Sequence, residues 1–173
     1  AGIRNVQQIQ RTLQAAIFAT PPVQGTLVYG GTAEVAMSYT ISPVHTEEYF
    51  VDLAKRIEDM GADTICIKDM ANLLLPYAAY SLVKKLKAAT KLPIHVHTHN
   101  TTGTGDMTYM KAIEAGADIV DTALSPMANG TSQPATEALV ATLRGTQYDT
   151  GVNLEMLSKA AEYFRKVRDR KSV

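Results

Sequence analysis

The chain has 173 residues, of which 46% are hydrophobic and 20% are charged, and its formal net charge is zero. That balance is typical of one globular domain, offers no basic surface for nucleic acid, and includes no apolar run near the ~20 residues that span a bilayer. A single cysteine, Cys66, excludes an internal disulfide framework, so we expect one domain in a reducing, cytoplasmic compartment.

Hydrophobic periodicity and turn residues predict helices and strands along the whole chain. The chain begins with a predicted helix at 6–19 and two strands at 26–29 and 34–40, which are consistent with a hairpin. A helix capped by Thr46 and ended by Gly61 follows, then a strand at 64–67, a helix opened by Pro76 and a strand at 94–98. The last predicted elements are a helix at 105–115, a strand at 119–123, and helices at 132–143 and 154–169, of which the second is capped by Asn153. From residue 34 onward strands alternate with helices, which indicates an α/β fold with a parallel sheet.

Two further features support a parallel sheet. The runs 64–67 and 119–123 are apolar on both faces, as strands covered by helices are. The sequence Gly-Ala-Asp precedes each of these runs, at 61–63 and 116–118, which suggests one type of helix-to-strand connection used twice.

Three of the four histidines lie in the segment PIHVHTHN at 93–100. Alternate residues of a strand point to the same side, so His95, His97 and His99 are expected to share one face. Imidazoles placed this way can bind one divalent metal. Solvated or core-satisfied histidines are the alternative, and for this spacing we favour metal binding.

Lys68 and Asp69 directly follow the strand at 64–67. A lysine at the end of a buried strand is costly to desolvate without a partner. Lys68 is therefore a candidate Schiff-base amine, anion binder or carbamylated metal ligand. An ion pair with Asp69 or a neighbouring acid is an equally good structural explanation.

Thr131 and Ser132 follow the strand at 119–123 and precede the helix expected at 132–143. A hydroxyl in this place usually caps a helix, and on position alone we favour capping over a proton relay to a substrate. Cys66 lies in mid-strand, where a buried, inert thiol is the expected interpretation. Lys68, the histidines and Thr131 all follow consecutive strands, and this end of a parallel barrel or sheet carries the active site.

At these residues the sequence resembles the carboxyltransferase domain of biotin-dependent enzymes, a group that includes pyruvate carboxylase, the oxaloacetate decarboxylase α subunit and transcarboxylase. The decarboxylase is the most similar of the three, through SYTISPVHT at 38–46. The other matching stretches are GADTICIKDMANLLL at 61–75, PIHVHTHNTTG at 93–103, VDTA at 120–123 and TSQP at 131–134.

The resemblance implies a divalent metal, zinc, manganese or cobalt, held by an Asp, a carbamylated Lys and two His. Carried over by motif, Lys68, His97 and His99 are the ligands, and His95 is a neighbour. Thr131 would pass a proton between substrate and biotin, with Ser132 and Gln133 beside the biotin cofactor. The implied reaction moves a carboxyl group between biotin, delivered by a carrier domain, and pyruvate or oxaloacetate.

Only the fifth to eighth strands of the family barrel have counterparts here. Segments corresponding to the family's metal Asp, its substrate Arg and its Met-Lys-Met biotin site are not found, and 1–33 is atypical, whereas 34–173 is family-like. A whole barrel takes ~250 residues. We therefore expect half of a TIM-type barrel, completed by dimerisation, with weak or no activity. A structural or engineered module without catalysis and a metal-dependent aldol lyase or synthase are the alternatives.

Overall fold

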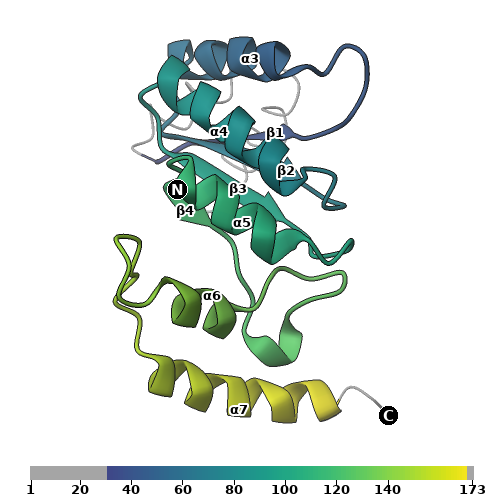
Figure 1. Cartoon of the computed structure of the whole chain (residues 1–173), viewed down its shortest axis with the longest axis vertical. Coiled ribbons are helices and arrows are strands. Elements are labelled where there is room, and N and C mark those ends of the chain that lie inside the picture. Colours follow the sequence, from purple (N-terminus) through teal and green to yellow (C-terminus); the bar gives the residue numbers. More distant parts are fainter. Residues whose placement is uncertain (1–30, 171–173) are drawn as a thin grey trace, which may run out of the picture.

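The computed structural model describes residues 31–170, which form a four-stranded parallel sheet with helices along one face (Figure 1). The strands are β1 (Glu34–Ser38), β2 (Thr64–Asp69), β3 (Ile94–Thr98) and β4 (Ile119–Val120). Their order in the sheet is the order in the chain, β1-β2-β3-β4. The helix expected at 6–19 and the strand expected at 26–29 lie outside the described residues.

The helices between and after the strands form two groups. They are α3 (Glu47–Asp59), α4 (Pro76–Ala89), α5 (Gly105–Glu114), the short 3-10 helix η1 (Ser125–Met127), α6 (Thr136–Leu143) and α7 (Leu154–Arg170). Helices α3, α4 and α5 lie over the sheet, while α7 packs on α6 and η1 at one end of the molecule (Figure 1). This is half of a TIM-type barrel, opened out as a sheet with its outer helices.

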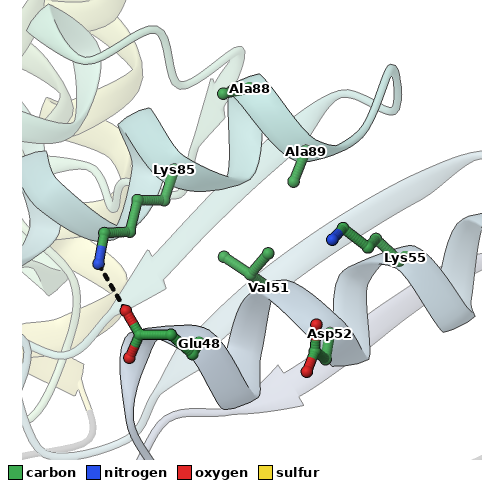
Figure 2. Close-up of a pocket in the computed structure, with 7 residues that line it drawn as sticks. All are labelled: Glu48, Val51, Asp52, Lys55, Lys85, Ala88 and Ala89. Carbon is green, nitrogen blue, oxygen red and sulfur yellow. Dashed lines mark hydrogen bonds and ion pairs between the residues drawn. The ribbon is translucent and has the colours of Figure 1, made fainter.

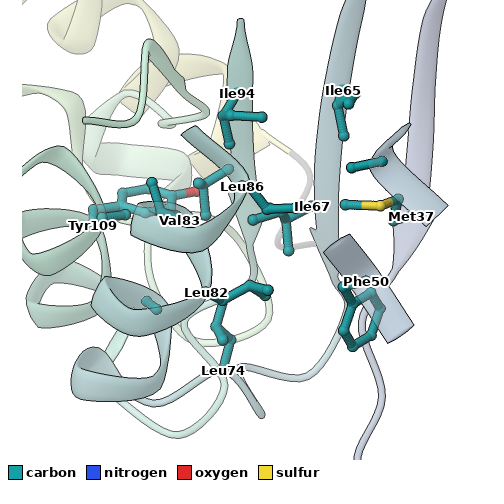
Figure 3. Close-up of a cluster of buried hydrophobic side chains, with 14 of the residues drawn as sticks. Met37, Phe50, Ile65, Ile67, Leu74, Leu82, Val83, Leu86, Ile94 and Tyr109 are labelled. Atoms are coloured by element: carbon teal, nitrogen blue, oxygen red, sulfur yellow. The ribbon is translucent and has the colours of Figure 1, made fainter. Parts of the chain in front are cut away.

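The helix-facing side of the sheet is apolar because the strands alternate. Met37, Ile65, Ile67, Ile94 and Val96 are all buried and pack against the helices. Figure 3 shows the cluster, to which the helices contribute Phe50, Leu82, Val83, Leu86 and Tyr109. Burial of this face fixes the strand register, and the register in turn decides which side chains face the other way.

The residues expected to begin α3, α4 and α7 do so. The Thr46 side chain accepts a hydrogen bond from the Tyr49 amide at 3.2 Å, and Pro76 is the first residue of α4. Gly61 follows the end of α3 with a φ of 84°, a conformation that favours glycine. Before α7, Asn153 accepts from the Met156 amide at 3.1 Å.

Two boundaries differ from the sequence prediction by more than two residues. The strand expected at 119–123 is regular only over Ile119–Val120, and Ala123 instead forms an isolated bridge with Ala135. Helix α6 begins at Thr136 and not at 132, because a turn with positive φ at Asn129 and Gly130 precedes it. The residue at its N-cap is Ala135, so the expected capping by Thr131 or Ser132 is wrong.

The sheet face turned away from α3, α4 and α5 is polar. It carries the alternate residues of each strand, among them Glu34, Ser38, Cys66, Lys68, His95 and His97. In a closed barrel this would be the interior face.

Candidate metal centre

His97 and His99 bring two ring nitrogens together at the end of β3. Their Nε2 atoms lie 3.3 Å apart, and the rings meet edge to face at 71°. The other nitrogen of each ring is anchored. Nδ1 of His97 lies 2.6 Å from Oδ2 of Asp121, and Nδ1 of His99 lies 2.6 Å from the carbonyl oxygen of Thr131.

These anchors decide where the protons are. The Thr131 carbonyl can only accept a hydrogen bond, so Nδ1 of His99 must carry a proton, and the Asp121 carboxylate favours the same tautomer in His97. In the neutral rings both Nε2 atoms are then bare acceptors that face each other. Two metal-bound imidazole nitrogens at ~2.0–2.1 Å in a tetrahedral site lie ~3.3 Å apart, which fits the observed spacing.

Lys68 lies on the strand beside the histidines. It is the register partner of His97, so both side chains project from the polar face on neighbouring strands. Its side chain is exposed and forms no ion pair within residues 31–170. The strand pairing therefore puts an amine next to the two imidazoles.

The alternative of a Lys68–Asp69 ion pair is wrong. Asp69 is fully buried on the opposite, helix-facing side. Its carboxylate accepts hydrogen bonds from the Leu73 amide at 3.0 Å, the Leu74 amide at 2.9 Å and the Thr98 hydroxyl at 3.1 Å. Asp69 thus organises the loop after β2 and does not form an ion pair with Lys68.

Thr131, Ser132 and Gln133 lie in the turn before α6. Thr131 is exposed and contacts His99 through its carbonyl oxygen. Ser132 accepts from the Asn100 amide through its own carbonyl at 2.7 Å, and its hydroxyl donates to Gln133 Oε1 at 3.3 Å. The turn is therefore joined to the end of the histidine strand, and the expected proton relay and biotin contacts stay predictions.

Sequence reasoning missed the role of Asp121. This carboxylate lies 2.6 Å from His97 Nδ1 and 3.0 Å from His95 Nε2. Burial raises its pKa, but the interactions with His97 and His95 outweigh that effect and the pKa is lowered overall. Asp121 comes two residues after Ile119, the register partner of His95, and that spacing is the signal that could have located it.

His95 lies deeper along the same strand and among anionic groups. Interactions with the Cys66 thiol and the Glu34 carboxylate, together with the charge of Asp121, raise the pKa of His95 to about 10 against the opposing effect of burial. The Glu34 contact is 3.0 Å at Nδ1. This part of the polar face favours a positive charge.

Asn72 ties together the loops that follow β2 and β3. It is fully buried and has a φ of 54°. Its Oδ1 accepts from the Thr102 hydroxyl at 2.6 Å, the Thr104 hydroxyl at 3.0 Å and the Thr104 amide at 3.2 Å. The loop after Lys68 and the loop after His99 are thereby held as one unit.

A hollow lies elsewhere, between two helices. A cleft of about 560 Å³ runs between α3 and α4, lined by Val51, Ala88 and Ala89 and by charged residues that include the Glu48–Lys85 ion pair (Figure 2). It is on the outer side of these helices and contains no histidine, cysteine or hydroxyl. The histidine end of the sheet has the groups suited to chemistry, and we place the candidate site there.

The sequence profile of the HMGL-like family matches residues 6–164. The chain belongs to the HMGL-like family. Within this family it is 57% identical over 141 residues to one of the pyruvate carboxylase subunits of Methanocaldococcus jannaschii, covering 82% of this chain and 25% of that protein. It is 45% identical over 141 residues to the methylmalonyl-CoA carboxyltransferase 5S subunit of Propionibacterium freudenreichii, covering 80% and 28%.

Solved structures of the HMGL-like family agree with the fold. The carboxyl transferase domain of Rhizobium etli pyruvate carboxylase with pyruvate and biocytin has a TM-score of 0.84 and 36% identity, over 86% of this chain and 26% of that one. The chain thus spans about a quarter of the length of each of these three proteins. The expected resemblance to biotin-dependent carboxyltransferases is confirmed. Among residues 31–170, no helix is long and apolar enough to cross a membrane.

Proposed function

We propose that this chain supplies the Lys68, His97 and His99 side of a divalent metal centre for carboxyl transfer between biotin and pyruvate or oxaloacetate. The observation that carries the proposal is the pair of Nε2 atoms 3.3 Å apart, with both Nδ1 atoms anchored by acceptors. Relatives named pyruvate carboxylase and carboxyltransferase support carboxyl transfer over aldol chemistry.

Each residue has a defined task in this proposal. A bound divalent cation would polarise the keto oxygen of the substrate as a Lewis acid. Asp121 and the Thr131 carbonyl keep the histidine protons on Nδ1, so that Nε2 is free to bind. Lys68 is the exposed amine available to become a carbamate ligand, a step in which its nitrogen bonds to CO2 and releases a proton. The Thr131 hydroxyl moves the substrate proton, and Ser132 and Gln133 contact biotin.

Turnover requires groups beyond these. A second anionic metal ligand and a cation for the substrate carboxylate must come from whatever polypeptide completes the barrel. We propose that a second copy of this chain closes the barrel as a homodimer, and that 1–173 by itself binds metal with weak or no carboxyl transfer. A module kept for its architecture alone would bind no metal at the histidines.

Isothermal titration calorimetry with manganese and zinc tests the metal site. We expect His97→Ala to weaken manganese affinity by about 10- to 100-fold, because one of two imidazole ligands is lost. His45→Ala is the matched control, since His45 pairs with Ser42 in the loop before α3 and is outside the site. Equal manganese affinity in the wild type and His97→Ala would reject the proposal.

A further inference from the structure

A second set of metal-binding groups lies on the same face, deeper along the strands. Three possible metal-ligand atoms, one each from the side chains of Glu34, Cys66 and His95, lie within 4.8 Å of one another. The three residues come from three neighbouring strands, and Cys66 and His95 are register partners. The His95 ring spans the middle strand, because its Nδ1 reaches Glu34 Oε2 at 3.0 Å.

His95 is also left with an unsatisfied atom. Its side chain is only 11% exposed, and its buried Nε2 forms no hydrogen bond with a described residue. Asp121 Oδ1 lies 3.0 Å from this nitrogen, but not in an orientation that makes a hydrogen bond. A buried nitrogen that has a charged neighbour but no hydrogen bond is uncommon.

We propose that Glu34, Cys66 and His95 form a second metal site, distinct from the one at His97 and His99, that binds a thiophilic divalent cation such as zinc. Thiolate, imidazole and carboxylate are all ligands of tetrahedral zinc, and water can fill the fourth position. Donor atoms around tetrahedral zinc lie about 3.3–3.6 Å apart. Glu34 is on the exposed rim, where its carboxylate lies 3.0 Å from His95 Nδ1 and has room to adjust to a bound cation.

The two sites are separated along the strands. Cys66 and His95 each precede Lys68 and His97 by two residues, which is about 6.6 Å of strand. They also differ in chemistry, because only the deeper set contains sulfur. Manganese should therefore prefer the Lys68, His97 and His99 end, and zinc or cobalt can occupy both.

The binding step balances without any redox partner. The S–H bond of Cys66 breaks, the sulfur bonds to the cation, and the proton passes to solvent. A proton on the ligating nitrogen of His95 is released in the same way. Cys66 is buried, so the cation enters from the Glu34 side, where the face is open.

Cobalt(II) titration of the full chain tests the site, because Cys66 is the only cysteine in the sequence. A cobalt–thiolate bond gives a charge-transfer absorption in the near ultraviolet that nitrogen and oxygen ligands do not give. Because cobalt can occupy both sites, we expect this absorption to saturate by two added cobalt ions per chain in the wild type. It should be absent in Cys66→Ser and retained in the double variant His97→Ala/His99→Ala.

Three results would overturn the assignment of the second site. No absorption in folded wild type means that Cys66 does not bind metal, and an absorption that never saturates means adventitious thiol contact only. Loss of the absorption in His97→Ala/His99→Ala would mean one shared site. Retained absorption with no manganese binding would instead reject the proposed function and leave this site standing.

Glu34→Gln provides a test that does not disturb the core. Glu34 is exposed, so the variant should fold as the wild type does, with circular dichroism as the check. We expect cobalt affinity, read from the thiolate absorption, to fall by about tenfold or more. Asp52→Asn, an exposed acid on α3, is the matched control and should bind as the wild type does. Unchanged affinity in Glu34→Gln would overturn the three-residue site.

Discussion

Tyr109 holds the end of the strand that carries the histidines. Its ring is fully buried, and its hydroxyl accepts from the Thr98 amide at 3.1 Å and donates to the Thr98 carbonyl at 3.4 Å. Thr98 lies between His97 and His99, so the Tyr109 side chain positions both histidines from the helix-facing side. Burial raises the pKa of the Tyr109 hydroxyl, an effect larger than the opposing hydrogen bond with Thr98.

Tyr109→Phe should destabilise the fold in a pH-dependent way. Near neutral pH we expect a loss of about 1–3 kcal/mol, because the Thr98 amide loses its acceptor. Since the folded pKa of Tyr109 is raised, the unfolded chain loses its proton first as pH rises above about 10, and the wild type loses that part of its stability. The difference in free energy of unfolding between the wild type and Tyr109→Phe should therefore become smaller when urea unfolding is measured at alkaline pH. A difference in free energy of unfolding that grows with pH would contradict this account.

Strand alternation was enough to predict that the histidines share one face, and the order of the strands to predict Lys68 at the same end of the sheet. It could not identify Asp121 as the partner of His97, because that contact depends on the register between β3 and β4. The sequence also suggested a role for Thr131 only through its hydroxyl, whereas its backbone carbonyl contacts His99. Backbone acceptors carry no signature in the residue type, so contacts of this kind are invisible in sequence.

Among the elements, α3 begins with a side-chain cap that can be tested alone. Thr46→Ala should reduce the free energy of unfolding by about 1 kcal/mol, because the Tyr49 amide loses its acceptor. Thr46→Ser keeps a hydroxyl and is the matched control. Urea unfolding of the three proteins measures the effect. Equal losses in both variants would mean that the cap contributes nothing.

The elements best predicted are those whose ends have local signals. Pro76 at the start of α4 and the alternating pattern of β3 needed no tertiary information. Helix α6 and strand β4 were misjudged because the turn at Asn129 and Gly130 and the Ala123–Ala135 bridge depend on distant packing. Boundaries in this part of the chain follow from the fold and not from propensity.

The described sheet has two outer strands, β1 and β4, each with one neighbour. Unpaired strand edges favour association. We expect sedimentation velocity to show a concentration-dependent dimer at micromolar protein concentrations. Ala36→Arg should shift it toward monomer, because Ala36 is exposed on the face that a closed barrel would enclose. A monomer at all concentrations would reject barrel closure by a second copy.

The Asn72 carboxamide has a consequence for anyone who recombines these barrels. Because one buried oxygen receives three donors from Thr102 and Thr104, the segment after β2 does not fold independently of the segment after β3. Transplanting either loop alone into a homologous scaffold would leave that oxygen or those hydroxyls without hydrogen-bond partners. The two must be exchanged as a pair, and crossover points for chimeras belong before β2 or after α5.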